Sequence, residues 1–109
     1  MDALTHHLQA DPDAERLVRT DPFAFLLGAL LDHGIPPERA WRGPLELSRR
    51  LGHLYPARMV AEPDAVRAAV AGPPALHRYR ETVAGWVLEA ARTIEVLEHD
   101  LGVHVRPDG

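Results

Sequence analysis

The chain has 109 residues, a formal net charge of −4 and 46% apolar residues, so it suits one domain with a modest core and is too short for two. It contains no cysteine, which excludes disulfides, thiolate nucleophiles and cysteine-bound zinc. All twelve basic residues are arginine, so no lysine is present to form a Schiff base with a carbonyl substrate.

The first two predicted helices each begin at an Asp-Pro pair. Asp11 is expected to cap a short helix over Pro12–Val18, and Asp21 to cap a second helix that opens at Pro22. This second helix has apolar residues at helical spacing and more on its opposite side, which predicts a central position: Phe23, Leu26, Leu27, Leu30 and Leu31, with Phe25 and Ala29 opposite. Gly34 is expected to end it, and the prolines that follow prevent continuation.

The middle of the chain predicts several shorter helices. One starts near Pro37 and contains Ala40 and Trp41, and we expect a break at Gly43-Pro44 before "LELSRRLG". "YPARMVAE" predicts one or two helical turns, and "EPDAVRAAVAG" a further helix with a proline start and a glycine stop.

The last predicted element is a long helix over Glu81–Leu101. Its apolar positions keep a helical period: Val83, Trp86, Val87, Ala90, Ile94, Leu97 and Leu101. No segment alternates like a strand, so the predicted fold is all-α, a compact orthogonal bundle of about five or six helices in a single domain over residues 1–109. Residues 1–10 and 104–109 are expected to be loose termini. No signal peptide or membrane-spanning run is predicted, and we expect a cytoplasmic protein.

Charge is unevenly distributed along the chain. Residues 36–80 carry eight arginines and four acids, whereas residues 1–35 and 81–109 each carry two arginines and six acids. A basic middle between acidic ends could form a nucleic-acid face, or its arginines could pair with acids of the flanking helices. From charge alone, pairing is the favoured interpretation.

Asp32 and His33 are adjacent polar residues at the end of the second helix. Neighbouring side chains on a helix point about 100° apart, so adjacency does not make a catalytic dyad. The alternatives are a polar helix end or a ligand-facing position. The seven histidines show no metal-ligand spacing, and neither a metal nor a cofactor is predicted.

Two stretches carry a resemblance to a known family. "DPFAFLLGALLDHGIPPERAWRGPLELSRRLG" and "PPALHRYRETVAGWVLEAARTI" together resemble the N-terminal half of helix-hairpin-helix (HhH-GPD) base-excision DNA repair proteins, of an actinobacterial-type uncharacterised branch, over roughly residues 11–95. The resemblance implies two all-α subdomains with DNA between them. It also implies a hairpin that grips phosphates and a catalytic aspartate after that hairpin, with access to an extruded base.

The chain departs from this family pattern in three ways. It ends at Gly109, before the expected hairpin and aspartate, and it has no lysine. His33 and Gly34 stand where the branch has two glutamines. The resemblance therefore implies a non-catalytic, half-length relative.

Three functions follow as expectations. The first is a DNA-associated or accessory module, completed by self-association or by a polypeptide carrying the missing hairpin half. The second is a homo-oligomeric interaction protein without a nucleic-acid role, which could bury Ile94, Leu97 and Leu101. The third is a small glycosylase-like enzyme using Asp32 and His33. The residues expected to face DNA or a ligand are Asp32, His33, Gly34, Arg39, Arg42, His77, Arg78 and Arg80.

Overall fold

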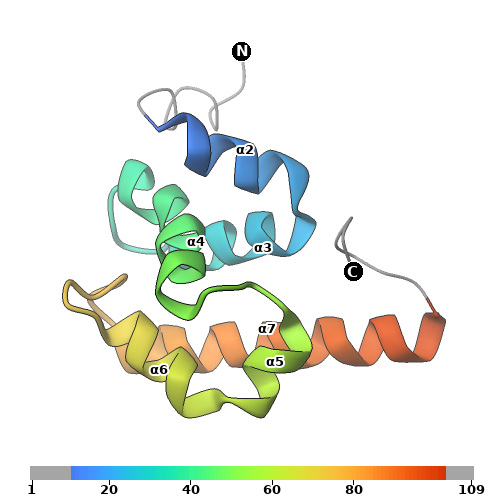
Figure 1. Cartoon of the computed structure of the whole chain (residues 1–109). Helices are drawn as coiled ribbons and strands as arrows, with labels where there is room; N and C mark the ends of the chain where they lie inside the picture. Colours follow the sequence, from blue (N-terminus) through green and yellow to red (C-terminus); the bar gives the residue numbers. More distant parts are fainter. Residues whose placement is uncertain (1–10, 103–109) are drawn as a thin grey trace.

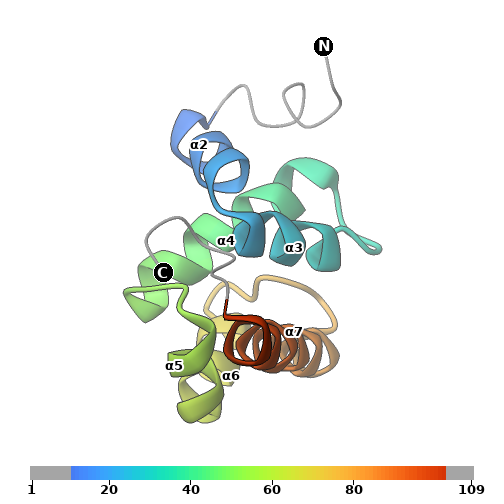
Figure 2. The same ribbon diagram turned by 90° about the vertical axis from the view of Figure 1, so that its right-hand side faces the viewer.

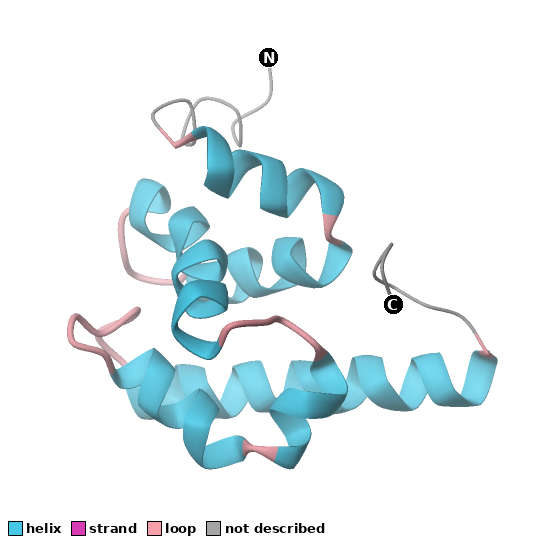
Figure 3. Cartoon of the chain, in the orientation of Figure 1, coloured by secondary structure: helices cyan, strands magenta, loops and turns pink. Residues whose placement is uncertain are grey.

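The computed structural model describes residues 11–102, and the predicted all-α bundle is confirmed there. It contains six helices: α2 (Pro12–Thr20), α3 (Pro22–Leu31), α4 (Pro37–Leu51), α5 (Pro56–Ala61), α6 (Pro63–Ala71) and α7 (Arg80–Leu101). Figure 3 shows no strand in this part of the chain. The expectation of loose ends at residues 1–10 and 104–109 lies outside the described residues.

The helices form two groups that share one core. α2, α3 and α4 pack on one another, as do α5, α6 and α7, and the groups meet where α3 contacts α7 and α4 contacts α6 (Figure 1). Viewed along α7, the second group lies below the first (Figure 2). Phe23, Leu27, Leu47, Val70 and Val87 are among the fully buried side chains that join them. No helix within residues 11–102 is long and apolar enough to cross a bilayer.

The two predicted aspartate caps are confirmed. An Asp11 Oδ1 atom accepts from the Ala14 amide at 3.1 Å, and an Asp21 Oδ1 atom accepts from the Phe23 amide at 3.0 Å. Each bond satisfies an amide that the first turn of a helix leaves without a partner, and proline follows where no amide is needed.

The end of α3 differs from the prediction. The helix stops at Leu31 rather than at a glycine cap, and Asp32 turns the chain with φ −81° and ψ 59°. The His33 amide donates to the Leu31 carbonyl at 2.8 Å, which makes Asp32 the centre of an inverse γ-turn. Gly34 follows with φ +80°, a value that favours glycine, so the glycine serves the loop instead of the helix end.

The predicted break at Gly43-Pro44 is wrong, because α4 continues through both residues. A proline inside a helix costs about 3 kcal/mol through its missing hydrogen bond and its clash with the preceding turn. Pro44 and Gly43 are both buried, together with Ala40 and Leu47 on the same helix. A Cβ atom on Gly43 would come within 2.3 Å of a Leu31 methyl group, so this glycine lets α3 and α4 approach closely. Burial on the α3 side offsets the cost of the proline.

The buried face of α7 contains only two of the seven apolar positions that keep the helical period. These are Val83 and Val87, and Ala84, Leu88 and Ala91 complete the buried face. Trp86 is 42% exposed, and Leu97 and Leu101 are 43% and 66% exposed. Ile94 is half-buried against the core. Small alanines allow neighbouring helices to come close, so the alanine side of α7, and not the tryptophan side, faces the core.

Candidate functional site

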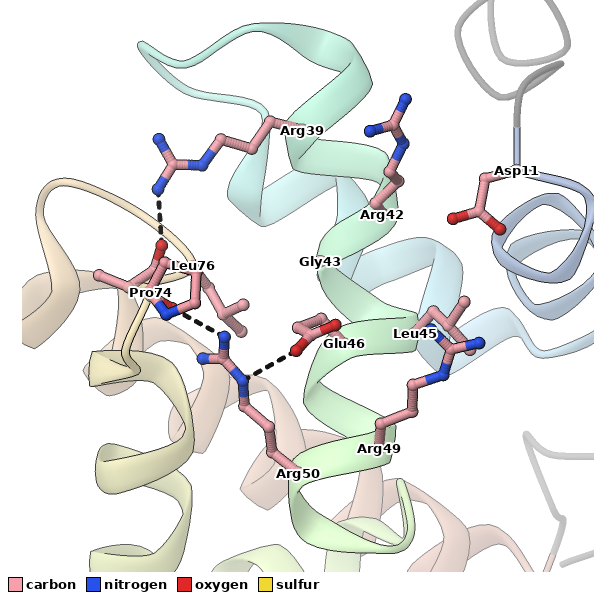
Figure 4. A pocket seen from close by; sticks show the side chains of 11 residues that line it. Asp11, Arg39, Arg42, Gly43, Leu45, Glu46, Arg49, Arg50, Pro74 and Leu76 are labelled. Atoms are coloured by element: carbon pink, nitrogen blue, oxygen red, sulfur yellow. Dashed lines mark hydrogen bonds and ion pairs between the residues drawn. The ribbon is translucent and has the colours of Figure 1, made fainter.

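A groove of about 460 Å³ lies between α4, the start of α2 and the segment before α7. Four arginines of α4 line it, together with two carboxylates: Arg39, Arg42, Arg49 and Arg50, with Asp11 and Glu46 (Figure 4). We call this the arginine groove. All four arginines fall within an arc of roughly 100° because α4 is one uninterrupted helix at 100° per residue.

Two of these arginines hold the far wall of the groove in place. Arg50 donates to the carbonyls of Ala69 and Pro74 at 2.7 and 2.8 Å, and its Nε lies 3.1 Å from Glu46. Arg39 donates to the Ala75 carbonyl at 2.6 Å. These bonds attach the end of α6 and the turn between α6 and α7 to α4, so both arginines already have structural partners.

The other two arginines are available to a ligand. Arg42 is exposed and makes no hydrogen bond or ion pair with any residue between 11 and 102. Arg49 lies 3.8 Å from Asp13, and both side chains are more than half exposed. Such an ion pair contributes little and is easily exchanged for a stronger one. In Figure 4 both side chains extend on the Asp11 side of α4, away from the wall that Arg39 and Arg50 hold.

Most arginines of the basic middle do not pair with acids of the flanking helices, which the pairing interpretation had favoured. Of the basic middle, only Arg49 forms an ion pair with a flanking helix in the described part of the chain. Arg50 pairs with Glu46 of the same helix, Arg58 pairs with Glu62 at the C-terminal cap of α5, and backbone carbonyls are the other acceptors. The sequence did not indicate these carbonyl partners, because they depend on how the turn folds back on α4.

Asp32 and His33 do not face each other. The Asp32 carboxylate accepts from the Trp41 indole N–H at 3.3 Å. The His33 Nδ1 atom donates to the Leu30 carbonyl at 3.0 Å, and its ring meets the Trp86 ring edge-on at 5.8 Å. No hydrogen bond joins the two side chains in the described structure, so this geometry provides no acid–base pair.

His77 is fully buried and joins two distant segments. Its Nε2 donates to the His33 carbonyl at 2.6 Å, while its Nδ1 accepts from the Tyr79 amide at 3.1 Å. A carbonyl accepts and an amide donates, so this pattern requires the neutral imidazole with its proton on Nε2. His77 is thus a structural link and not a surface contact for DNA.

The remaining predicted site residues are spread over other surfaces. Gly34 lies beside Arg78, whose guanidinium stacks on the Tyr79 ring at 4.9 Å. Arg80 opens α7 and shares a separate hollow with Arg67. Of the eight predicted residues, only Arg39 and Arg42 belong to the arginine groove.

Sequence reasoning missed Arg49, Arg50 and Glu46 as parts of this site. Their signal was present, because residues 39, 42, 46, 49 and 50 share one side of a helix. The expected break at Gly43-Pro44 separated them into two elements and concealed the pattern. Within residues 11–102, no three histidine, aspartate or glutamate side chains gather as metal ligands would.

No family model, curated protein or solved structure matches this chain. The resemblance to HhH-GPD repair proteins therefore stays a prediction from the quoted sequence stretches.

Proposed function

We propose that this chain is a non-catalytic helical module that associates with duplex DNA by binding phosphates in the arginine groove. One observation carries the proposal: a single helix directs Arg42, which has no partner within residues 11–102, and Arg49, which has only an exposed ion pair with Asp13, into one groove. Two more arginines hold the far wall of that groove. The proposal includes the relationship to half of an HhH-GPD repair protein, because proteins of that family act on DNA.

Guanidinium groups suit this role because their planar fork matches two phosphate oxygens and keeps its charge at any physiological pH. Arg42 and Arg49 are seven residues apart, which is about 10 Å along α4. That separation allows each side chain to contact a different phosphate. Contacts of this kind position a protein on DNA without selecting a sequence.

No chemical step is included in the proposal. A glycosylase-like reaction would need an acid or a nucleophile at the bound base, and Asp32 and His33 are each engaged with a different neighbour. The chain has no lysine for an imine mechanism. The proposed role is thus accessory, and its proposed partner is a second polypeptide that carries the hairpin half.

The test is binding of a fluorescent DNA duplex, with and without an abasic site, over a range of salt concentrations. We expect affinity to fall as salt rises, and the double variant Arg42→Gln/Arg49→Gln to bind more weakly with a salt slope smaller by about 2. Arg58→Gln/Arg67→Gln removes the same two charges from exposed positions on α5 and α6 outside the groove and is the matched control. Absence of binding at low salt, even with a hairpin-bearing partner added, would refute the proposal.

A second candidate function is a helical interaction protein without a nucleic-acid role, self-association being its simplest form. The exposed side chains at the end of α7, Val96, Leu97 and Leu101, favour this candidate. Sedimentation that shows a monomer at high protein concentration would count against a homo-oligomer. If the Arg42→Gln/Arg49→Gln variant binds DNA as tightly as the parent protein, the arginine groove is not the DNA-binding site.

A further inference from the structure

A second hollow of about 440 Å³ lies between α3 and α7, and the DNA proposal does not use it. Leu26 and Leu30 of α3 form one side, and Trp86 and Ala90 of α7 form the other. His33 closes one end with its ring edge against Trp86. We call this hollow the tryptophan groove. Trp86 is 42% exposed in it.

The apolar surface continues along α7 beyond the groove. Trp86, Ala90, Leu97 and Leu101 fall within an arc of about 60° on this helix, next to its buried face, and Thr93 is an exposed polar residue on the same side. Leu97 and Leu101 are 43% and 66% exposed, and the last turns of α7 run past the other helices (Figure 1). From Trp86 to Leu101 the stripe is about 22 Å long. A narrow stripe of this length has the shape of a site for another helix rather than for a small molecule.

The charges beside the stripe are mainly acidic. Glu89 lines the groove, and Asp100, eleven residues later, lies within about 20° of it on the same edge of α7. Arg92 is the arginine of α7 that lies nearest to this edge, and its guanidinium is bonded to Glu89 at 2.8 Å. At the His33 end, Asp32 is exposed, while Arg78 is stacked on Tyr79. α3 contains no basic residue.

This charge pattern separates the possible occupants. Two copies of the chain joined through this face would bring acidic edges near each other, which opposes binding. A helix with lysine or arginine along its flank would instead meet Glu89 and Asp100 with opposite charge. The apolar stripe supplies the contact area, and the acidic edge selects the partner.

We propose that the tryptophan groove and the stripe that continues to Leu101 bind an amphipathic helix of another protein, with apolar residues on one face and basic residues on its flank. Trp86 and Leu97 are the anchors of this interface. The proposal is independent of DNA binding because the arginine groove shares none of these residues.

The experiment uses two designed helical peptides of about 16 residues, which matches the length of the stripe. Both have the same leucine face, one with lysine flanks and the other with glutamate flanks. Fluorescence anisotropy is expected to show binding of the lysine peptide and at least about tenfold weaker binding of the glutamate peptide. Trp86→Ala and Leu97→Ser are each expected to lower the affinity for the lysine peptide by about tenfold or more.

Phe25→Ala is the matched control, because Phe25 is a 48% exposed aromatic residue of α3 that does not line the groove. It should leave the peptide affinity unchanged, and circular dichroism should show that all variants keep their helix content. Glu89→Gln/Asp100→Asn should abolish the preference between the two peptides while retaining apolar binding.

Two results would overturn the proposal. Equal affinity for both peptides would remove the charge selection, and a dimer that Leu97→Ser dissociates would show that a second copy covers the face. DNA binding measured on the same variants is expected to be unchanged. The DNA measurement therefore tests the arginine groove, and the peptide measurement tests the tryptophan groove, independently of each other.

Discussion

The arginine groove and the tryptophan groove have nearly the same volume, about 460 and 440 Å³, and opposite chemistry. In the first, the polar side of α4 faces a turn whose carbonyls bind half of its arginines. In the tryptophan groove, apolar residues of α7 that are not buried in the core remain at the surface. Polar groups that have found backbone partners make a rigid wall, whereas unburied apolar groups make a surface that still gains free energy from a partner.

His77 connects the two grooves. It belongs to the turn that walls the arginine groove, and it hydrogen-bonds the carbonyl of His33, which lines the tryptophan groove.

The largest expected effect is therefore that of His77→Ala. It leaves a cavity and removes the partners of the His33 carbonyl and the Tyr79 amide, and should lower the free energy of unfolding by about 3 kcal/mol or more. Chemical denaturation measures this loss. If the variant remains folded, both DNA and peptide binding should weaken; a change confined to one groove would contradict the link.

The next effect is that of Arg50→Gln, which should affect one groove only. The change removes charged hydrogen bonds to the carbonyls of Ala69 and Pro74, from a side chain that is only 17% exposed. We expect a loss of about 2 kcal/mol in the free energy of unfolding and weaker DNA binding. Arg42→Gln is the comparison, because it should weaken DNA binding without a measurable loss of stability. Equal stability of the two variants would mean that the wall of the arginine groove does not depend on Arg50.

A smaller change in the opposite direction is expected for Gly85→Ala. Gly85 lies inside α7, and a Cβ atom there would have no neighbour within 4 Å. Alanine should stabilise the helix by about 1 kcal/mol, raising the denaturation midpoint without altering DNA binding. Gly28→Ala is the contrasting control, because its Cβ would come within 2.3 Å of the Trp41 ring. That variant should be less stable than the parent protein.

The smallest effect on stability is expected for Leu97→Ser. Leu97 is 43% exposed and lies on the outward side of α7, so the free energy of unfolding should change by no more than about 0.5 kcal/mol. Its proposed importance is for peptide binding alone. A large loss of stability, seen in the same denaturation measurement, would indicate that the stripe is part of the core after all.

Most of the fold could be predicted from the sequence. Asp11 and Asp21 cap their helices through bonds to amides two or three residues away, and the all-α class follows from apolar residues at helical spacing. The candidate site could be predicted only in part. Arg39 and Arg42 were recognised, but Arg49 and Arg50 were separated from them by the expected break at Pro44.

Helix starts are set by interactions within a few residues, which is why the sequence by itself determined them. Only the tertiary structure decided that Pro44 continues α4, that His77 is buried between two segments, and that the alanine side of α7 faces the core. Each of these outcomes depends on residues far away in the chain, such as Leu31 against Gly43 or the His33 carbonyl against His77. Burial and hydrogen-bond satisfaction are properties of the neighbours that cover a residue, and a local pattern does not contain them.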